Sequence, residues 1–326
     1  MKKLALPFAL TLVLAACGGN NEPAKPAAPE PAKPAAPAAP ATPAPTVAPE
    51  VAAWEKRMDE VLAGSWRSDA NKARDAHRHP RETLAFFGLK PGQVVIEVTP
   101  GGGWYTEILA PLEKGVGRLA VALVDPESAS SEGTKNYLAK SNAALQEKLA
   151  GDKDRYGEVE VRQFAQALPK LGDSNSADVV LTFRNVHNFM GWNSDKALFQ
   201  AAFDVLKPGG VLGVTDHRGE PGTDAQKIKD SGYIPEEYVI KLATDAGFVL
   251  EGKSEINANP KDTKDYEKGV WTLPPSLALG DKDKEKYVAI GESDRMTLKF
   301  VKPTNIASAP APAASAPAPA AAPVKE

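Results

Sequence analysis

An apolar run that leads into three consecutive glycines constrains the fold of this chain more than any other feature. Residues 95–109 read VIEVTPGGGWYTEIL: a short apolar strand containing Glu97, a glycine-rich turn, and the start of a helix. Ligands of α/β sheets bind beyond the carboxyl ends of the strands, where such turns lie. The stretch therefore predicts an α/β protein with a candidate binding turn after its first strand.

The amino-terminal end predicts export rather than structure. Residues 1–16 combine two early lysines with an apolar stretch too short to span a membrane, which is typical of a secretory signal. The sequence LAAC that closes it resembles the lipobox of bacterial lipoproteins, which implies cleavage before Cys17 and lipid attachment to that residue. The following residue is glycine rather than aspartate, which implies an outer-membrane anchor facing the periplasm. Cys17 is the only cysteine of the chain, so no disulfide is expected.

Two segments flank one predicted domain. Residues 17–50 are a lipidated cysteine followed by a stretch rich in Ala and Pro, and this composition is typical of a tether without a packed core. Residues 304–326 have a similar composition and predict a disordered tail. The domain between them, residues 51–303, has a size that is normal for a doubly wound α/β fold. The formal net charge of −3 gives no support for nucleic-acid binding.

Strands alternate with helices along this domain, which predicts a mostly parallel, doubly wound sheet. The apolar runs that predict strands are 94–98, 119–124, 177–183, 211–215, 248–250 and 296–301. The segments that predict helices are 51–62, 80–87, 104–112, 194–206 and 235–246.

The glycine spacing excludes two common nucleotide-binding turns. A dinucleotide fingerprint needs a third glycine three residues after Gly103, and that position is Thr106. A phosphate-binding loop needs Gly-Lys-Ser or Gly-Lys-Thr, which does not occur in the chain. What remains is an acidic residue in the first strand followed by a glycine turn of another type.

This pattern resembles motif I of the class I S-adenosylmethionine-dependent methyltransferases, with Glu97, Gly101 and Gly103 in register and Thr99 in place of the first glycine. Three further stretches resemble the later strands and turns of that family in order and spacing: SADVVLTFRNVHNFMGW, ALFQAAFDVLKPGGVLGVTDH and IPEEYVIKLATDAGFVL. The chain is most similar to a little-characterised group of methyltransferases that share DAHRHP, PGGGWYTEIL, VTDHRG and DRMTLKFVKP. The resemblance covers most of residues 75–302 and implies a Rossmann-like sheet of seven strands whose last strand is antiparallel.

The resemblance also implies a cofactor, S-adenosylmethionine, and residues that bind it. The residues expected to contact it are Glu97, Thr99, Gly101, Gly102, Gly103, Asp125 and Arg184. Asp125, at the end of the second strand, stands where an acid usually contacts the ribose. The acid that usually lies near the adenine is missing, because Phe164 occupies its position.

Methyl transfer to a hydroxyl or amine benefits from a general base. His187 and His217 follow the fourth and fifth strands of the resemblance, on the ligand side, and Tyr105 begins the helix after the glycines. We therefore predict these three as catalytic candidates. Asp216 is not automatically the partner of His217, because neighbouring strand residues point to opposite faces.

Other polar residues are candidates for binding the acceptor, for a lid or for a metal site. Arg184, Asn185, His187 and Arg218 are candidates to bind an anionic or polar acceptor. His77 and His79 have a spacing of two with only Asp75 close by, which is weak for a metal, and no metal is predicted. Asp75 and Arg78 are expected in a lid over the cofactor. Trp271 is expected either to cap the acceptor pocket or to anchor an insertion.

Two functions remain open at this point. The first is an S-adenosylmethionine-dependent methyltransferase that acts on a small-molecule or envelope acceptor. The second is a catalytically inactive binding lipoprotein of the cell envelope that keeps the methyltransferase fold, because this cofactor is not expected outside the cytoplasm. A hydrolase that uses His217 has no nucleophile turn and no metal-ligand set in the sequence.

Overall fold

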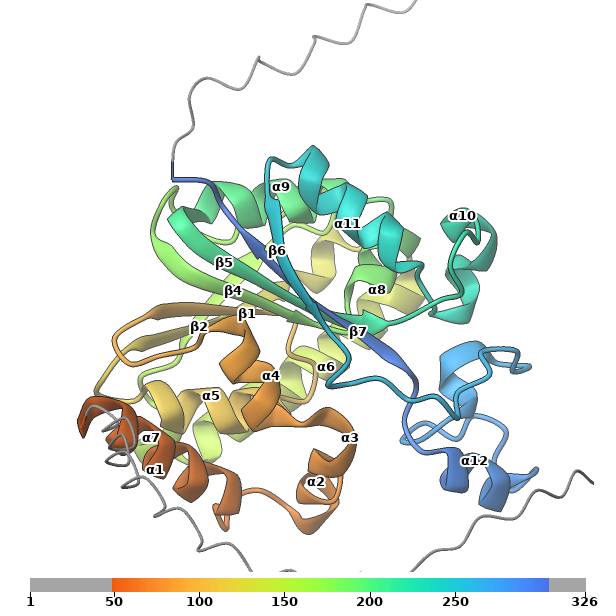
Figure 1. The fold of residues 1–326 in the computed structure, drawn as a ribbon, viewed down its shortest axis with the longest axis horizontal. Helices are drawn as coiled ribbons and strands as arrows, with labels where there is room; N and C mark the ends of the chain where they lie inside the picture. Colours follow the sequence, from red (N-terminus) through yellow and green to blue (C-terminus); the bar gives the residue numbers. More distant parts are fainter. Residues whose placement is uncertain (1–48, 305–326) are drawn as a thin grey trace, which may run out of the picture. The chain divides into compact units, whose positions relative to one another are not determined.

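The computed structural model describes residues 49–304. The signal sequence, Cys17, nearly all of the tether and the tail lie outside the described residues. The centre of the fold is a seven-stranded sheet with the order β3-β2-β1-β4-β5-β7-β6 (Figure 1). The strands are β1 (Val94–Val98), β2 (Arg118–Val124), β3 (Glu160–Phe164), β4 (Ala177–Phe183), β5 (Leu206–His217), β6 (Val249–Ser254) and β7 (Arg295–Val301).

Strand directions match the expectation from the sequence. β1 runs parallel to both β2 and β4, β2 is parallel to β3, and β4 is parallel to β5. The last strand, β7, lies between β5 and β6 and is antiparallel to both. The predicted seven-stranded, mostly parallel sheet with an antiparallel last strand is therefore confirmed. The six predicted strands all form, and the seventh is β3, which the sequence left unplaced.

Helices cover both faces of the sheet (Figure 1). One face packs against α1 (Pro49–Ala63), α4 (Pro80–Phe87), α5 (Thr106–Glu113) and α7 (Lys153–Tyr156). The other face packs against α8 (Val186–Gly191), α9 (Asp195–Val205) and α11 (Glu236–Asp245). The remaining helices are α2 (Asp69–Lys72), α3 (Asp75–Arg78), α6 (Glu132–Gly151), α10 (Ala225–Ile228) and α12 (Lys284–Ile290), with 3-10 turns at Pro126–Ser128, Lys229–Ser231 and Gly269–Thr272.

Alternation along β1 explains how one strand serves both faces. Val95 belongs to the cluster beneath α4 and α5, whereas Ile96 and Val98 belong to the cluster beneath α8 and α9. Successive strand residues point to opposite faces, so a central strand buried on both sides reads as a continuous apolar run. Glu97 breaks this run, and it is only 2% exposed.

Two segments meet beside the carboxyl ends of the strands. One is the amino-terminal stretch that carries α2 and α3, and the other is residues 255–294, inserted between β6 and β7 and carrying α12 (Figure 1). Ion pairs from Arg74 and Arg78 of the first segment to Glu292 of the second connect them. The insertion is further held by Tyr233, whose hydroxyl donates to Asp262 at 2.8 Å.

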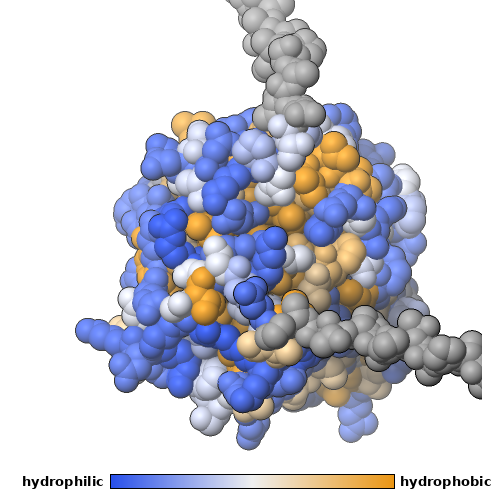
Figure 2. Space-filling view, turned by 60° about the vertical axis from the view of Figure 1, so that its left-hand side comes forward, coloured by the Kyte–Doolittle hydropathy of each residue, from blue (hydrophilic) through white to orange (hydrophobic). Residues whose placement is uncertain are grey.

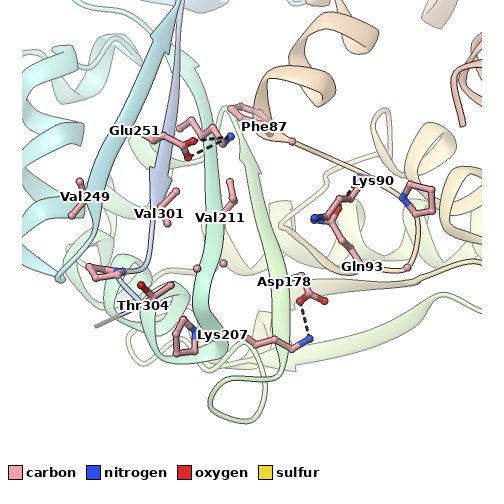
Figure 3. Close-up of a pocket in the computed structure, with 18 residues that line it drawn as sticks. Phe87, Lys90, Gln93, Asp178, Lys207, Val211, Val249, Glu251, Val301 and Thr304 are labelled. Carbon is pink, nitrogen blue, oxygen red and sulfur yellow. Dashed lines mark hydrogen bonds and ion pairs between the residues drawn. The ribbon is translucent and has the colours of Figure 1, made fainter. Parts of the chain in front are cut away.

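A hollow of about 950 Å³ lies at the opposite edge of the sheet, near the amino ends of β1, β4 and β5 (Figure 3). Lys207 and Lys299 in its wall pair with Asp178 and Glu251. Ligands of parallel sheets bind at the carboxyl ends of the strands, so this hollow is not the candidate site. The face that lies to the left in Figure 1 is mostly hydrophilic, and its hydrophobic residues gather mainly toward the upper right of the view in Figure 2. Among the described helices, none has the length and apolar content needed to cross a membrane.

Candidate functional site

A cavity of about 460 Å³ opens at the carboxyl ends of β1, β4 and β5. The chain passes from β1 to β2 on one side of the sheet and from β4 to β5 on the other, so β1 and β4 flank the switch point where such folds bind ligands. Residues from the glycine turn, from α6, from the ends of β4 and β5, and from the insertion line it. They include Thr99, Pro100, Gly101, Thr134, Tyr137, Arg184, Asn185, His187, His217, Trp271, Glu292 and Arg295.

The glycine turn has a left-handed backbone at three positions. The φ angles are 43° at Thr99, 59° at Gly101 and 76° at Gly103, a region that disfavours side chains. A Cβ atom at Gly101 would meet nothing within 4 Å, whereas one at Gly103 would lie 2.7 Å from Leu145 Cδ1. Gly101 therefore keeps backbone open toward the cavity, and Gly103 allows the turn to approach α6. Gly102 is exposed and outside the lining.

Asn185 fixes this turn to the end of β4. Its amide nitrogen donates to the carbonyl oxygens of Val98 at 3.0 Å and Thr99 at 3.1 Å. The Thr99 backbone is thus held in a strained conformation by a neighbouring strand, as at many ligand-binding turns. The Thr99 hydroxyl is buried without a hydrogen-bond partner among the described residues, and Thr99 is one of the residues that line the cavity.

The predicted acidic cofactor contacts lie outside the cavity lining. Glu97 accepts a hydrogen bond from the Thr106 hydroxyl at 2.6 Å, and burial raises the pKa of its carboxyl to about 7. Asp125 accepts from the backbone N–H of Glu127 at 3.0 Å and so caps the short turn that follows β2. Phe164, at the position of the missing adenine acid, is buried in the core.

His187 is held by Asp216. Asp216 is fully buried, and its carboxylate lies 3.0 Å from His187 Nδ1. The same carboxylate accepts the backbone N–H groups of Val186 and His217, both at 2.7 Å. Because a carboxylate can only accept, this places the ring proton of His187 on Nδ1. Its Nε2 has no partner in the described part of the chain, and the ring lines the cavity, which is the arrangement of a general base.

His217 is the second histidine of the site, and its ring centroid lies 5.3 Å from that of His187. Its Nδ1 pairs with the Ser293 hydroxyl, whereas Asp216 accepts only the backbone N–H of this residue. Burial, together with His187 and Arg295 nearby, holds the pKa of His217 well below its usual range, so the ring is neutral at pH 7. Trp271 stands on the rim, 39% exposed and 6.2 Å from the His187 ring.

Tyr105, the third catalytic candidate, is placed differently. Its ring stacks on Phe183 with a centroid distance of 3.5 Å, and its hydroxyl donates to the Arg78 carbonyl at 3.3 Å. Burial raises the pKa of this phenol to about 12. It lines a small neighbouring void and not the main cavity, so the structure gives it a packing position beneath Phe183.

The arginines predicted to bind an acceptor separate into two kinds. Arg184, directly after β4, lines the cavity, and its guanidinium makes no hydrogen bond or ion pair with the described residues. Burial, with Arg295 beside it, lowers the pKa of Arg184 to about 10. Arg218 instead binds Asp294 and Glu255, each through two bonds, and lies outside the lining. Asp75, expected in a lid, pairs with Arg67 at 2.6 Å.

One group of potential metal ligands occurs in the described part of the chain. Atoms of His187, Asp216 and His217 lie within 4.8 Å of one another. Asp216 already accepts three N–H groups at 3.0 Å or less, and guanidinium groups surround the histidines. Both features disfavour a divalent cation at this place. His77 and His79 lie apart from this group, outside the cavity lining.

Sequence reasoning missed two contributors from distant segments. Glu292 and Arg295 reach the cavity from the insertion and the start of β7. Arg78, expected in a lid over the cofactor, lies close behind them on α3. Arg295 belongs to the stretch DRMTLKFVKP, which indicated the resemblance but no site role. The pairing of β5 with β7, which sets Arg295 opposite His217, is what brings them together.

Comparisons with known proteins bear on the fold alone. No family model and no curated protein matches the chain. A solved S-adenosylmethionine-dependent methyltransferase from Aquifex aeolicus is 17% identical with a TM-score of 0.46, and the alignment covers 75% of this chain and 98% of that one. A putative methyltransferase from Bacillus halodurans is 18% identical with a TM-score of 0.45, over 70% of this chain and 100% of that one. The [4+2]-cyclase SpnF is 15% identical with a TM-score of 0.49, and the alignment covers 77% of this chain and 93% of that one.

The strand order and directions, with β7 antiparallel between β5 and β6, define the protein as one with a methyltransferase-like α/β fold. This fold carries more than one chemistry, so the function has to be argued from the site.

Proposed function

We propose that this protein is an S-adenosylmethionine-dependent methyltransferase. The observation that carries the proposal is that the open glycine turn and the Asp216-held histidine share one cavity at the switch point of the sheet. The volume of about 460 Å³ is within the range of small-molecule sites. Because Gly101 has no side chain, the methionine part of the cofactor can approach the backbone there, and a Cβ atom would narrow this space. The Thr99 hydroxyl, which has no hydrogen-bond partner among the described residues, supplies a polar group at the same turn.

Bound at this turn, S-adenosylmethionine would supply an activated methyl group, so the protein's task is chiefly to position an acceptor in line with it. His187 Nε2 would accept the proton that an acceptor hydroxyl or amine loses when its oxygen or nitrogen takes the methyl group, with the methyl carbon–sulfur bond breaking and S-adenosylhomocysteine leaving. Asp216 keeps Nε2 unprotonated and stabilises the charged ring that results. Neutral His217 and Trp271 narrow the space in which the acceptor can lie.

A specific observation favours the second candidate, an inactive binding protein. Asp125 caps its own turn and Phe164 is buried in the core, so neither offers a polar contact for the ribose or the adenine. Such a protein would bind a ligand in the same cavity without transferring a methyl group. Anchoring through Cys17 at the outer membrane belongs to either proposal.

Calorimetric titration of the full chain with S-adenosylmethionine and S-adenosylhomocysteine separates the two. Gly101→Ala is the test variant, because the added Cβ projects into open space beside the turn. Gly115→Ala is its matched control: Gly115 has a φ of 71°, its Cβ would also meet nothing within 4 Å, and it lies in a turn after α5. We expect micromolar binding that Gly101→Ala weakens at least tenfold and Gly115→Ala leaves unchanged. Absence of binding to the folded wild type would reject the methyltransferase.

A further inference from the structure

Four arginines gather around one carboxylate beside the cavity. Glu292 is 2% exposed and pairs with Arg74 Nε at 2.5 Å, with Arg78 Nε at 3.2 Å, and with Arg295. Burial alone would raise the pKa of Glu292, but the three guanidiniums hold it well below its usual range. The fourth arginine, Arg184, stands next to this group, between it and the histidines.

Several donors of this cluster have no partner. Arg78 and Arg295 are only 2% and 3% exposed, yet both Nη atoms of Arg78 and the Nε of Arg295 make no hydrogen bond within residues 49–304. A void of about 10 Å³ lies among them, and it shares Phe183, Arg184 and Arg295 with the lining of the main cavity. Buried donors without acceptors are costly, so the cluster is incomplete as it stands.

The charges of the cluster are also unbalanced. Arg74, Arg78, Arg184 and Arg295 face two carboxylates, those of Glu292 and Asp216, which leaves two positive charges without a counterpart. Burial and the neighbouring guanidiniums lower the pKa values of Arg78 and Arg184. An anion brought among these groups would supply both the missing acceptors and the missing charge.

Arg218 shows what a purely structural arginine looks like in this chain. It forms two bonds to Asp294 and two to Glu255, and no unpartnered buried atom remains on it. Arg184 lies one strand away and has none of these bonds. This contrast makes a scaffold role a poor explanation for Arg184.

We propose that Arg184, with Arg295 behind it, binds a carboxylate or phosphate group of the molecule that is methylated. The inference rests on the proposed function for the role of that molecule. The sheet order places this group to one side of the cofactor turn: Thr99–Gly101 follow β1, Arg184 follows the neighbouring β4, and Arg295 begins β7 beyond β5. His187 and His217 lie on the same side as the arginines. An acceptor held by its anionic group would therefore present its nucleophile to His187.

The test is calorimetric titration of the full chain, at constant ionic strength, with inorganic phosphate in one arm and succinate in another. Each titration is run on the free chain and again with saturating S-adenosylhomocysteine. Arg184→Gln is the test variant, because Arg184 is partly exposed to the cavity and its guanidinium makes no hydrogen bond or ion pair with the described residues, so its removal breaks no contact that holds the fold. Arg118→Gln is the control, since Arg118 is exposed at the amino end of β2, away from the cavity, and its side chain makes no hydrogen bond or ion pair with the described residues.

We expect at least one anion to bind, at least tenfold more weakly to Arg184→Gln and equally to Arg118→Gln, with binding kept when S-adenosylhomocysteine is present. The anion that binds more tightly, phosphate or succinate, shows whether the site prefers a phosphate or a carboxylate group. Equal binding to wild type and Arg184→Gln, or no binding of either anion, would overturn the inference. Loss of anion binding in the presence of S-adenosylhomocysteine would also overturn it, because the arginines would then hold the cofactor's own carboxylate. Arg184-dependent anion binding without any S-adenosylhomocysteine binding would support the anion site while rejecting the proposed function.

Discussion

Glu113, on α5, is 1% exposed, and neither of its carboxyl oxygens has a hydrogen-bond partner in the described part of the chain. Burial raises the pKa of this carboxyl to about 8. A carboxyl whose pKa is raised in the folded state favours folding below its unfolded value of 4.5, and this contribution is lost as the pH rises toward 8. Glu113 is therefore a source of instability at neutral and mildly alkaline pH.

Glu113→Gln should remove the loss of stability that the buried carboxyl causes as the pH rises. We expect the free energy of unfolding of the variant, relative to wild type, to increase between pH 5 and pH 8 by about 1.4 kcal/mol per pH unit. Chemical denaturation at both pH values measures this difference in the free energy of unfolding. Glu82→Gln is the control, because Glu82 is exposed. Parallel pH dependences for Glu113→Gln and wild type would contradict the assignment.

Asp216 determines which nitrogen of His187 carries the proton. In Asp216→Asn the amide can present its NH₂ group to Nδ1, and the proton then moves to Nε2. Side-chain ¹⁵N NMR should show the Nδ1–H form in wild type and a shift toward the Nε2–H form in the variant. The chain has only four histidines, which keeps the spectrum simple. The same tautomer in both proteins would argue against His187 as an oriented base.

At the scale of elements, Glu292 joins the insertion to α3. Removing its charge in Glu292→Gln leaves the buried Arg78 and Arg295 and the partly exposed Arg74 without their counter-ion, which typically costs about 3–5 kcal/mol. We expect a loss of that size in chemical denaturation and faster hydrogen exchange in residues 69–78. Glu267→Gln removes an ion pair of the same insertion that is more than half exposed, and it should cost less than about 1 kcal/mol. Equal effects of the two substitutions would contradict a structural role of the cluster.

Elements with a clear apolar pattern could be predicted from the sequence, whereas the polar edge strand β3 could not. Predicted strand 94–98 coincides with β1, predicted helix 80–87 with α4, and predicted strand 177–183 with β4. Each has an apolar pattern that only one structure satisfies. β3, with the sequence EVRQF, was not predicted because it is an edge strand whose first two residues are exposed and whose side chains are mostly polar.

The site was predictable to the extent that it depends on strand ends. The carboxyl ends of parallel strands meet at one edge, and Thr99, Gly101, Arg184, His187 and His217 do share a cavity. The partners of these residues were not predictable, because they depend on which distant segments pack there. Asp216 lies 29 residues from His187, and Ser293 lies 76 residues from His217.

At the scale of the whole molecule, the signal and the lipobox predict where the domain is held. Cys17→Ser removes the sulfur to which lipid would be attached. We expect the wild type to fractionate with membranes and to incorporate radiolabelled palmitate, and the variant to do neither. Membrane fractionation that Cys17→Ser leaves unchanged would reject lipid anchoring at this residue, whatever the domain catalyses.

The central claim is that one cavity holds both the cofactor and the histidine base. Histidine side-chain NMR of the full chain, recorded during titration with S-adenosylhomocysteine, tests it most directly. His187 and His217 line the cavity, whereas His77 and His79 do not, so the four signals carry their own control. We expect saturable shifts of the His187 and His217 signals, with the signals of His77 and His79 unchanged. Binding that leaves His187 and His217 unmoved, or no binding at all, would contradict it.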